Sequence, residues 1–173
     1  MIKSIVLAID GSTHAKNAQV VAIDLATKYG AQLTLVHVLT DEHPPLELAR
    51  MAEVEHMSDS NRPRTNDKGD TYSSIARFLG SANESKEGRI IALLGEQIVN
   101  KAAASASKAG VKKVTIEIHT GDYANNILKV AQRADADMIV MGRRGLSKLK
   151  GFVTGSVSHK VSQRAECSVL TVK

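Results

Sequence analysis

The chain has 173 residues, a net charge of +5 and only 3% aromatic residues. This length suits one domain with its own core, and the scarcity of aromatic side chains argues against single-strand nucleic-acid modules, which stack bases on aromatic rings. The one cysteine, Cys167, excludes an intramolecular disulfide and a thiolate metal cluster, and the surplus of basic residues favours an anionic ligand such as a nucleotide or a nucleic acid.

The first elements of the chain are predicted as a strand, a helix and a second strand. Residues 5–9 are continuously apolar, which is typical of a strand that is covered on both faces. The run ends at Asp10 after about five residues, too short for the apolar part of a signal peptide, so we expect a cytoplasmic protein. Ser12 offers a helix cap, apolar residues then recur at helical spacing as far as Tyr29, and residues 33–39 form the second strand.

Residues 41–90 interrupt this regular pattern. They hold all three prolines, clusters of Ser, Asn, Asp and Gly, and charges of both signs. Because such a connection is long for an α/β domain, we expect an insertion within a single domain of residues 1–173. Its composition predicts high mobility and at most short helices, near 46–57 and 72–79. Since it leaves the end of the second strand, it is a candidate lid over a ligand pocket.

The second half of the chain returns to alternating helices and strands. They are predicted as a helix over 87–109, a strand over 114–118, a helix from Asp122, a strand over 138–141, a helix from Gly155 and a strand over 168–172. This alternation predicts an α/β fold, a doubly wound five-stranded parallel sheet in the order 3-2-1-4-5 with helices on both faces. Ligands of such sheets bind at the carboxyl ends of the strands where the strand order reverses, so Asp10 and Gly142 are expected to face each other across a crevice.

The segment after the fourth predicted strand is rich in glycine and in basic residues. Gly142 and Gly145 are followed by nine residues and then by Gly155 at the start of a predicted helix. Glycine lets a backbone approach an anion closely, and the N–H groups at a helix N-terminus bind phosphate. No Asp or Glu occurs between Asp137 and Glu166. The glycine spacing alone fits equally well a surface loop with a solvated basic face.

Taken together, these patterns resemble the universal stress protein (UspA) family, of the ATP-binding type. The similarity covers residues 1–40 and 88–173, and the G-x2-G-x9-G-S signature is complete. It implies a Rossmann-like fold of the adenine nucleotide alpha hydrolase type, with ATP as the ligand and an optional Mg²⁺ or Mn²⁺ on its phosphates. It also implies a homodimer formed through the last strand. The implied function is a regulatory role in the stress response, in which protein partners distinguish the ATP-bound and empty states. The similarity is carried by residues 5–12, 35–38, 121–122, 136–145, 155–156 and 167–173.

The resemblance also implies roles for individual residues. The side chain of Asp10 would contact adenine, and the backbone of Val38 would meet the edge of the base. The ribose and phosphates would be lined by Met141, Gly142, Arg144 and Gly145. The N–H groups of residues 155–158, with the hydroxyls of the two serines, would hold the phosphate tail. A side chain on any signature glycine would project toward the phosphates or strain a positive-φ backbone. The expected cofactor-binding residues are Ala8, Asp10, Val38, Met141, Gly142, Arg144, Gly145, Gly155, Ser156, Val157 and Ser158; no catalytic residue or metal ligand is expected.

Several alternatives remain open on the sequence. Asp10 can be merely a helix cap, and Arg143 and Arg144 can be solvated. His14 lacks the second histidine expected of related nucleotidyl-transferring enzymes, and a cap or solvent role suits it better. P-loop and dinucleotide fingerprints do not occur. The sequence therefore favours an ATP-binding regulatory module, with a slow ATP hydrolase or phosphotransfer enzyme second, and nucleic-acid binding third on charge alone.

Overall fold

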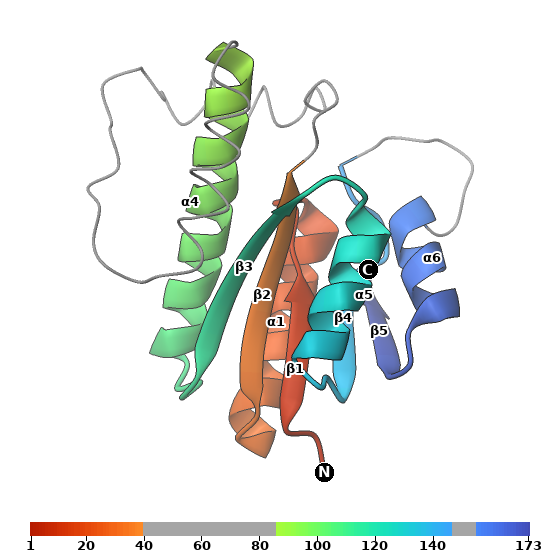
Figure 1. Cartoon of the computed structure of the whole chain (residues 1–173). Helices are drawn as coiled ribbons and strands as arrows, with labels where there is room; N and C mark the ends of the chain where they lie inside the picture. The colour runs from red at the N-terminus through yellow and green to blue at the C-terminus, as the bar shows by residue number, and fades with distance from the viewer. Residues whose placement is uncertain (40–85, 147–154) are drawn as a thin grey trace.

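The computed structural model describes residues 1–39, 86–146 and 155–173 (Figure 1). The short helices expected near 46–57 and 72–79, and the lid hypothesis, lie outside these residues. The helix predicted from about residue 87 begins at Lys86, inside the range expected for the insertion. In chain order the elements are β1 (Ser4–Ala8), α1 (Thr13–Tyr29), β2 (Gln32–Leu39), α4 (Lys86–Lys108), β3 (Val114–Thr120), α5 (Tyr123–Arg133), β4 (Met138–Gly142), α6 (Ser156–Arg164) and β5 (Ser168–Val172).

The five strands form one parallel sheet in the order β3-β2-β1-β4-β5. This confirms the predicted fold class and strand order, and each predicted strand end lies within two residues of the observed one. The order reverses between β1 and β4, because β2 and β3 extend the sheet on one side of β1 and β4 and β5 on the other. The crevice expected from the sequence therefore lies at the carboxyl ends of β1 and β4.

Helices cover both faces of the sheet, with α1 and α4 on one face and α5 and α6 on the other (Figure 1). Alternation along β2 divides its side chains between the two layers. Leu33, Leu35 and Leu39 join the core beneath α1 and α4, whereas Val36 and Val38 join the core beneath α5 and α6. Burial on both faces explains why this strand reads as a continuous apolar run in the sequence.

Helix α1 approaches the sheet through small side chains. Its buried residues are Ala15, Ala18, Ala22 and Ala26. Tyr29, which the helical spacing placed on the same face, is 44% exposed at the last position of the helix. The chain then turns at Gly30, whose φ of 64° is the left-handed cap conformation that glycine adopts without strain.

Candidate functional site

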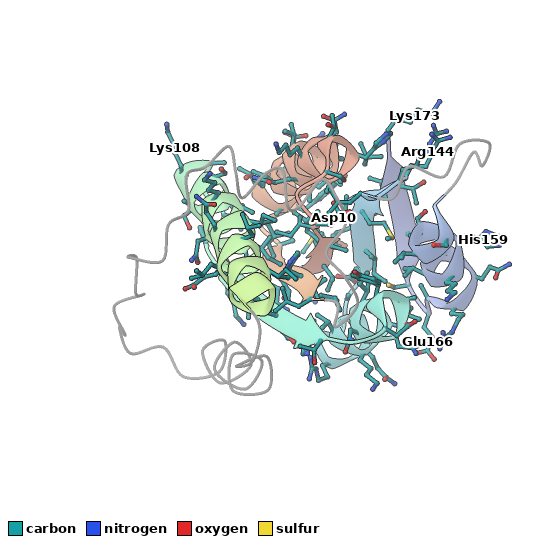
Figure 2. The ribbon with its side chains drawn as sticks, turned by 90° about the horizontal axis from the view of Figure 1, so that it is seen from above. Asp10, Lys108, Arg144, His159, Glu166 and Lys173 are labelled. Carbon is teal, nitrogen blue, oxygen red and sulfur yellow. The ribbon has the colours of Figure 1, made fainter. Side chains whose placement is uncertain are left out.

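The candidate site lies where β1 and β4 end side by side. Ala8 pairs in register with Met141, so the segments that follow the two strands leave the sheet at the same level. A Cβ atom added to Gly145 would lie 2.6 Å from Oδ2 of Asp10. The expected proximity of Asp10 to the glycine-rich loop is therefore confirmed. Figure 2, a view from above, shows Asp10 between the two helix layers.

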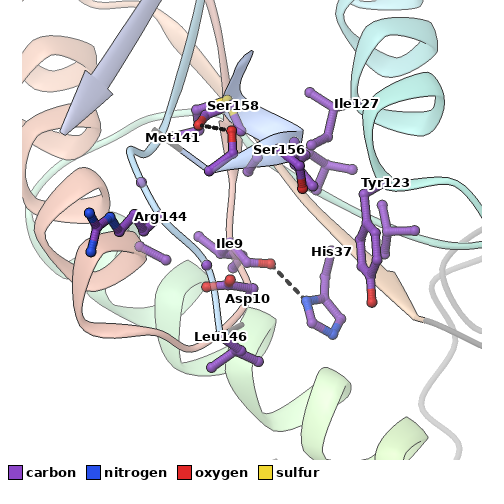
Figure 3. A pocket seen from close by; sticks show the side chains of 18 of the residues that line it. Ile9, Asp10, His37, Tyr123, Ile127, Met141, Arg144, Leu146, Ser156 and Ser158 are labelled. Carbon is purple, nitrogen blue, oxygen red and sulfur yellow. Dashed lines mark hydrogen bonds between the residues drawn. The ribbon is translucent and has the colours of Figure 1, made fainter. Parts of the chain in front are cut away.

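A pocket of about 180 Å³ opens at this edge (Figure 3). Its volume is more than ten times the ~10–15 Å³ that one water molecule needs. All eleven residues predicted as cofactor-binding line it, although their binding of a ligand stays a prediction. The remaining lining residues are Ile9, Ala15, Val36, His37, Leu39, Ile91, Tyr123, Ile127 and Leu146.

The N-terminus of α6 forms part of the pocket wall and lacks a side-chain cap. Its N-cap residue is Gly155, which has no side chain to accept a hydrogen bond. The first hydrogen bond within the helix runs from the N–H of His159 to the carbonyl of Gly155 (3.0 Å). The N–H groups of residues 156–158 therefore have no partner inside the helix. Together with the positive end of the helix dipole, they suit an anion.

Two groups expected to hold the phosphate tail are engaged within the protein. The N–H of Gly155 donates to the carbonyl oxygen of Arg143 (2.9 Å). The hydroxyl of Ser158, which is 2% exposed, donates to the same oxygen (2.8 Å), with the carbonyl of Gly155 at 3.0 Å. These bonds fasten α6 to the loop after β4. The groups that remain for an anion are the hydroxyl of Ser156 and the N–H groups of residues 156–158.

The structure corrects the expected reason for the three signature glycines. Gly142, Gly145 and Gly155 do not have positive φ, and a side chain on them would meet the protein itself. A Cβ on Gly142 would lie 2.9 Å from the backbone N of Ala15, and one on Gly155 would lie 3.1 Å from the carbonyl oxygen of Arg143. The glycines let the loop pack closely against α1, Asp10 and α6, which the spacing alone did not reveal.

Asp10 has the structural one of the two roles that the sequence left open, and it is placed where the other is possible. Its Oδ1 accepts a hydrogen bond from the N–H of Ser12 (2.9 Å), and Ser12 Oγ in turn accepts from the N–H of Ala15 (3.2 Å). Ser12 is thus the N-cap of α1, and the hydrogen bond to Asp10 holds Ser12 in position. The other oxygen, Oδ2, faces Gly145 in the pocket wall. One carboxylate can therefore support α1 and still meet a ligand.

The basic residues and His14 are placed differently from one another. The backbone N–H of Arg143 donates to the carbonyl oxygen of Val172 (2.7 Å). Arg144 lines the pocket, and its guanidinium is directed away from His37 and Tyr123 (Figure 3). The Nδ1 atom of His14 is buried, as is Nε of Arg143, and neither has a hydrogen-bond partner among the residues that the structure describes. The expected roles of His14 were a helix cap and contact with solvent. Its Nδ1 atom has neither role, because Ser12 caps the helix and this nitrogen is buried.

Sequence reasoning missed His37, which is 4% exposed on β2. Its Nδ1 lies 2.7 Å from the carbonyl oxygen of Ile9. Burial lowers the pKa of His37 below its ordinary value, while the hydrogen bond to Ile9 and the nearby Asp10 carboxylate oppose that shift. The signal in the sequence was a single titratable residue within the apolar run of residues 33–39, near the carboxyl end of a strand.

Two further features bear on the class of site. Within residues 1–39, 86–146 and 155–173, no three His, Cys, Asp or Glu residues are grouped so that they could hold a metal ion. None of the helices in these ranges is long and apolar enough to cross a membrane.

Comparison with known proteins agrees with the fold and the signature. The sequence model of the Universal stress protein family matches residues 1–173. Universal stress protein YxiE of Bacillus subtilis is 33% identical over 175 residues, covering 100% of both chains.

Solved structures of similar fold include three nucleotide complexes. One is a universal stress protein in complex with cAMP (TM-score 0.63, 21% identity, 99% of this chain and 97% of that one). Another, from Archaeoglobus fulgidus, is in complex with dAMP (TM-score 0.58, 19% identity, 100% and 98%). A family protein from Arabidopsis thaliana has AMP bound (TM-score 0.58, 17% identity, 99% and 91%). By its sequence and its fold, the chain belongs to the universal stress protein family.

Proposed function

We propose that this protein binds ATP in the pocket at the carboxyl ends of β1 and β4 and acts as a nucleotide-dependent regulatory module of the stress response. The observation that carries the proposal is the uncapped N-terminus of α6, which opens into a largely apolar pocket. An apolar cavity with a few convergent polar groups suits a planar base, and a helix N-terminus suits phosphate. Adenine nucleotides in the similar solved structures support this choice of ligand.

The charges of the pocket favour one orientation of the nucleotide. Asp10 carries a carboxylate on one side, and a carboxylate repels phosphate oxygens. The start of α6 attracts them, and the segment between Asp137 and Glu166 contains no acidic residue. We therefore propose that the base and ribose lie toward Asp10, Ala8 and Val38, and the phosphates toward Ser156. A Mg²⁺ or Mn²⁺ ion would enter on the phosphates, where it neutralises charge.

The direct test is calorimetric titration of the purified protein with ATP and with adenosine. We expect one ATP per chain and weaker binding of adenosine, because adenosine cannot use the N–H groups at the start of α6. Undetectable heat and unchanged thermal stability at millimolar ATP would contradict the proposal. A protein that binds adenosine as tightly as ATP would show that the phosphate site is wrong.

The alternative function is slow ATP hydrolysis or phosphotransfer by the same pocket. The two functions are separated by incubating the ATP-loaded protein with Mg²⁺ for hours and then quantifying bound and released nucleotide by chromatography. We expect the nucleotide to remain ATP. Conversion to ADP at a constant rate per protein, strongly reduced in a Ser156→Asp control that binds ATP weakly, would favour the enzyme.

We further propose that the protein is a cytoplasmic homodimer that pairs through β5, and that partner proteins distinguish its ATP-bound and empty states. β5 is an edge strand, with Ser168 exposed and Val169, Leu170, Thr171 and Val172 only half-buried. An exposed edge strand offers unpaired backbone groups to a second chain. Sedimentation equilibrium at micromolar concentration tests the dimer, and a monomer there would contradict it.

A further inference from the structure

His37 lies in a part of the pocket that the proposed nucleotide contacts above do not use. Alternation along β2 directs its side chain to the α1 and α4 face, opposite to Val38. The walls of this part of the pocket include Ile9, Leu39 and Ile91, which are apolar. A single polar side chain buried among apolar walls at the edge of a ligand pocket is the arrangement that fixes a ligand's orientation.

The hydrogen bond to Ile9 determines which ring nitrogen of His37 can accept. A carbonyl oxygen only accepts hydrogen bonds, so Nδ1, 2.7 Å from it, carries the proton. The lowered pKa keeps the ring neutral at physiological pH, and Nε2 therefore presents a lone pair. The hydrogen bond of the ring within the described residues is the one at Nδ1, and His37 lines the pocket, so Nε2 is available as an acceptor for a ligand.

Gly95 of helix α4 lies close to this edge of the ring, and its lack of a side chain leaves the space that the ring occupies. A Cβ added to Gly95 would lie 3.0 Å from Nε2 and 2.9 Å from Cδ2 of His37. Figure 3 shows Nδ1 joined to the carbonyl of Ile9 and the opposite edge of the ring turned toward α4. Glycine inside a helix costs about 1 kcal/mol relative to alanine, so its presence in the middle of α4 is explained by the space that the imidazole edge requires.

We propose that His37 is a base-reading residue, whose Nε2 accepts a hydrogen bond from the exocyclic amino group of a bound adenine. This assignment rests on the proposed function and specifies which feature of the nucleotide the pocket recognises. Adenine presents an N–H donor on a flat aromatic ring, whose faces suit apolar walls and whose amino group suits one acceptor. Asp10 and the N–H groups of α6 meet the ligand elsewhere, so His37 adds discrimination between bases and not affinity for phosphate.

The test pairs two ligands with two variants. ATP is compared with purine riboside 5′-triphosphate, which differs only by lacking the amino group. His37→Asn keeps an N–H donor near the Nδ1 position and removes the acceptor at Nε2, whereas His37→Gln can place an amide oxygen near the position of Nε2. Calorimetric dissociation constants are measured for all pairs, and thermal unfolding verifies that each variant is folded.

We expect the wild-type protein to bind ATP about tenfold more tightly than the purine analogue, which corresponds to one hydrogen bond. His37→Asn should remove that preference by weakening ATP alone, and His37→Gln should retain part of it. Equal binding of the two ligands by wild-type protein would overturn the assignment without any variant. Equal weakening of both ligands by His37→Asn would assign His37 a structural role instead. A wild-type protein that binds neither ligand would instead refute the proposed function itself, and with it this assignment.

Discussion

Helices α1 and α6 begin at the same edge of the sheet, yet their N-termini are completed in opposite ways. At α1, Ser12 accepts from the N–H of Ala15, and Asp10 accepts from the N–H of Ser12. At α6, Gly155 provides no side-chain cap. The fold thus satisfies one helix start from within and leaves the other open to the pocket. We therefore propose the start of α6, and not that of α1, as the anion site, because it lacks a side-chain cap and lines the pocket.

Helix α5 strengthens this comparison. Its N-cap, Asp122, accepts a hydrogen bond from the N–H of Asn125 (2.7 Å), so α5 resembles α1 and not α6. Both capped helices also carry a carboxylate near their start, Asp10 for α1 and Asp122 for α5, and this charge repels an anion from those positions. The start of α6 is the one among these three that neither a cap nor a nearby carboxylate neutralises.

The largest expected effect comes from making the start of α6 resemble that of α1. Ser156→Asp adds a carboxylate to the exposed first position of the helix. It should weaken ATP binding about a hundredfold, because it removes a hydrogen bond to a charged group and adds repulsion. Adenosine binding should change little, and thermal stability should not fall, because an acid in the first helical turn is favourable. Calorimetry with both ligands and a thermal melt measure these effects.

Ser162→Asp on the same helix is the matched control. Residue 162 is exposed near the C-terminus of α6, so the same charge is added far from the helix start. ATP affinity should stay within about threefold of the parent. If Ser156→Asp bound ATP as tightly as this control, the open helix start would not be the phosphate site.

The second prediction concerns the close contact between the loop and α1. Gly142→Ala places a methyl group 2.9 Å from the backbone of Ala15, and the backbone must shift. Overpacking of this kind lowers the free energy of unfolding by about 1–3 kcal/mol, and it should also weaken ATP binding because the loop moves. Gly110→Ala is the control: its φ is 94° and no atom lies near the added methyl. Chemical denaturation should show loss of stability in both, with ATP affinity retained only in Gly110→Ala.

The third prediction removes the cap of α1. Ser12→Ala should lower the free energy of unfolding by about 1 kcal/mol, the usual cost of losing an N-cap, as measured by urea denaturation. ATP affinity should fall by less than about threefold, since the start of α1 contributes structure and not phosphate contacts. A loss of ATP affinity as large as that of Ser156→Asp would erase the distinction between the two helix starts.

The strand order could be predicted from the sequence because alternating helices and strands restrict the crossovers to one hand, and because ligand sites of such sheets lie where the strand order reverses. The proximity of Asp10 to the loop followed from that order. The sequence could not show that Ser158 and the N–H of Gly155 are engaged by the carbonyl of Arg143, because that oxygen reaches them only after the loop folds back. The position of His37 beside Gly95 was equally hidden, since it depends on how α4 packs on β2.

The smallest expected effect tests whether a carboxylate must lie at the pocket edge to matter for the ligand. Asp137, at the amino edge of the sheet, resembles Asp10 in accepting backbone hydrogen bonds, from the N–H groups of Lys3 (2.6 Å) and Ser4 (3.0 Å). These bonds hold the pKa of Asp137 below its ordinary value. The pKa of Asp137 is therefore higher in the unfolded chain than in the folded one, so its contribution to stability is complete above pH about 4 and is lost as the pH falls through the folded pKa.

Asp137→Asn should slightly lower stability at pH 7, flatten the stability profile below pH about 4, and leave ATP binding unchanged. Asp10→Asn, in contrast, should weaken ATP and adenosine alike. If calorimetry at pH 7 found the two variants equally impaired in ATP binding, the carboxylate of Asp10 would have no particular place in the site, and its role would be limited to bracing the cap of α1.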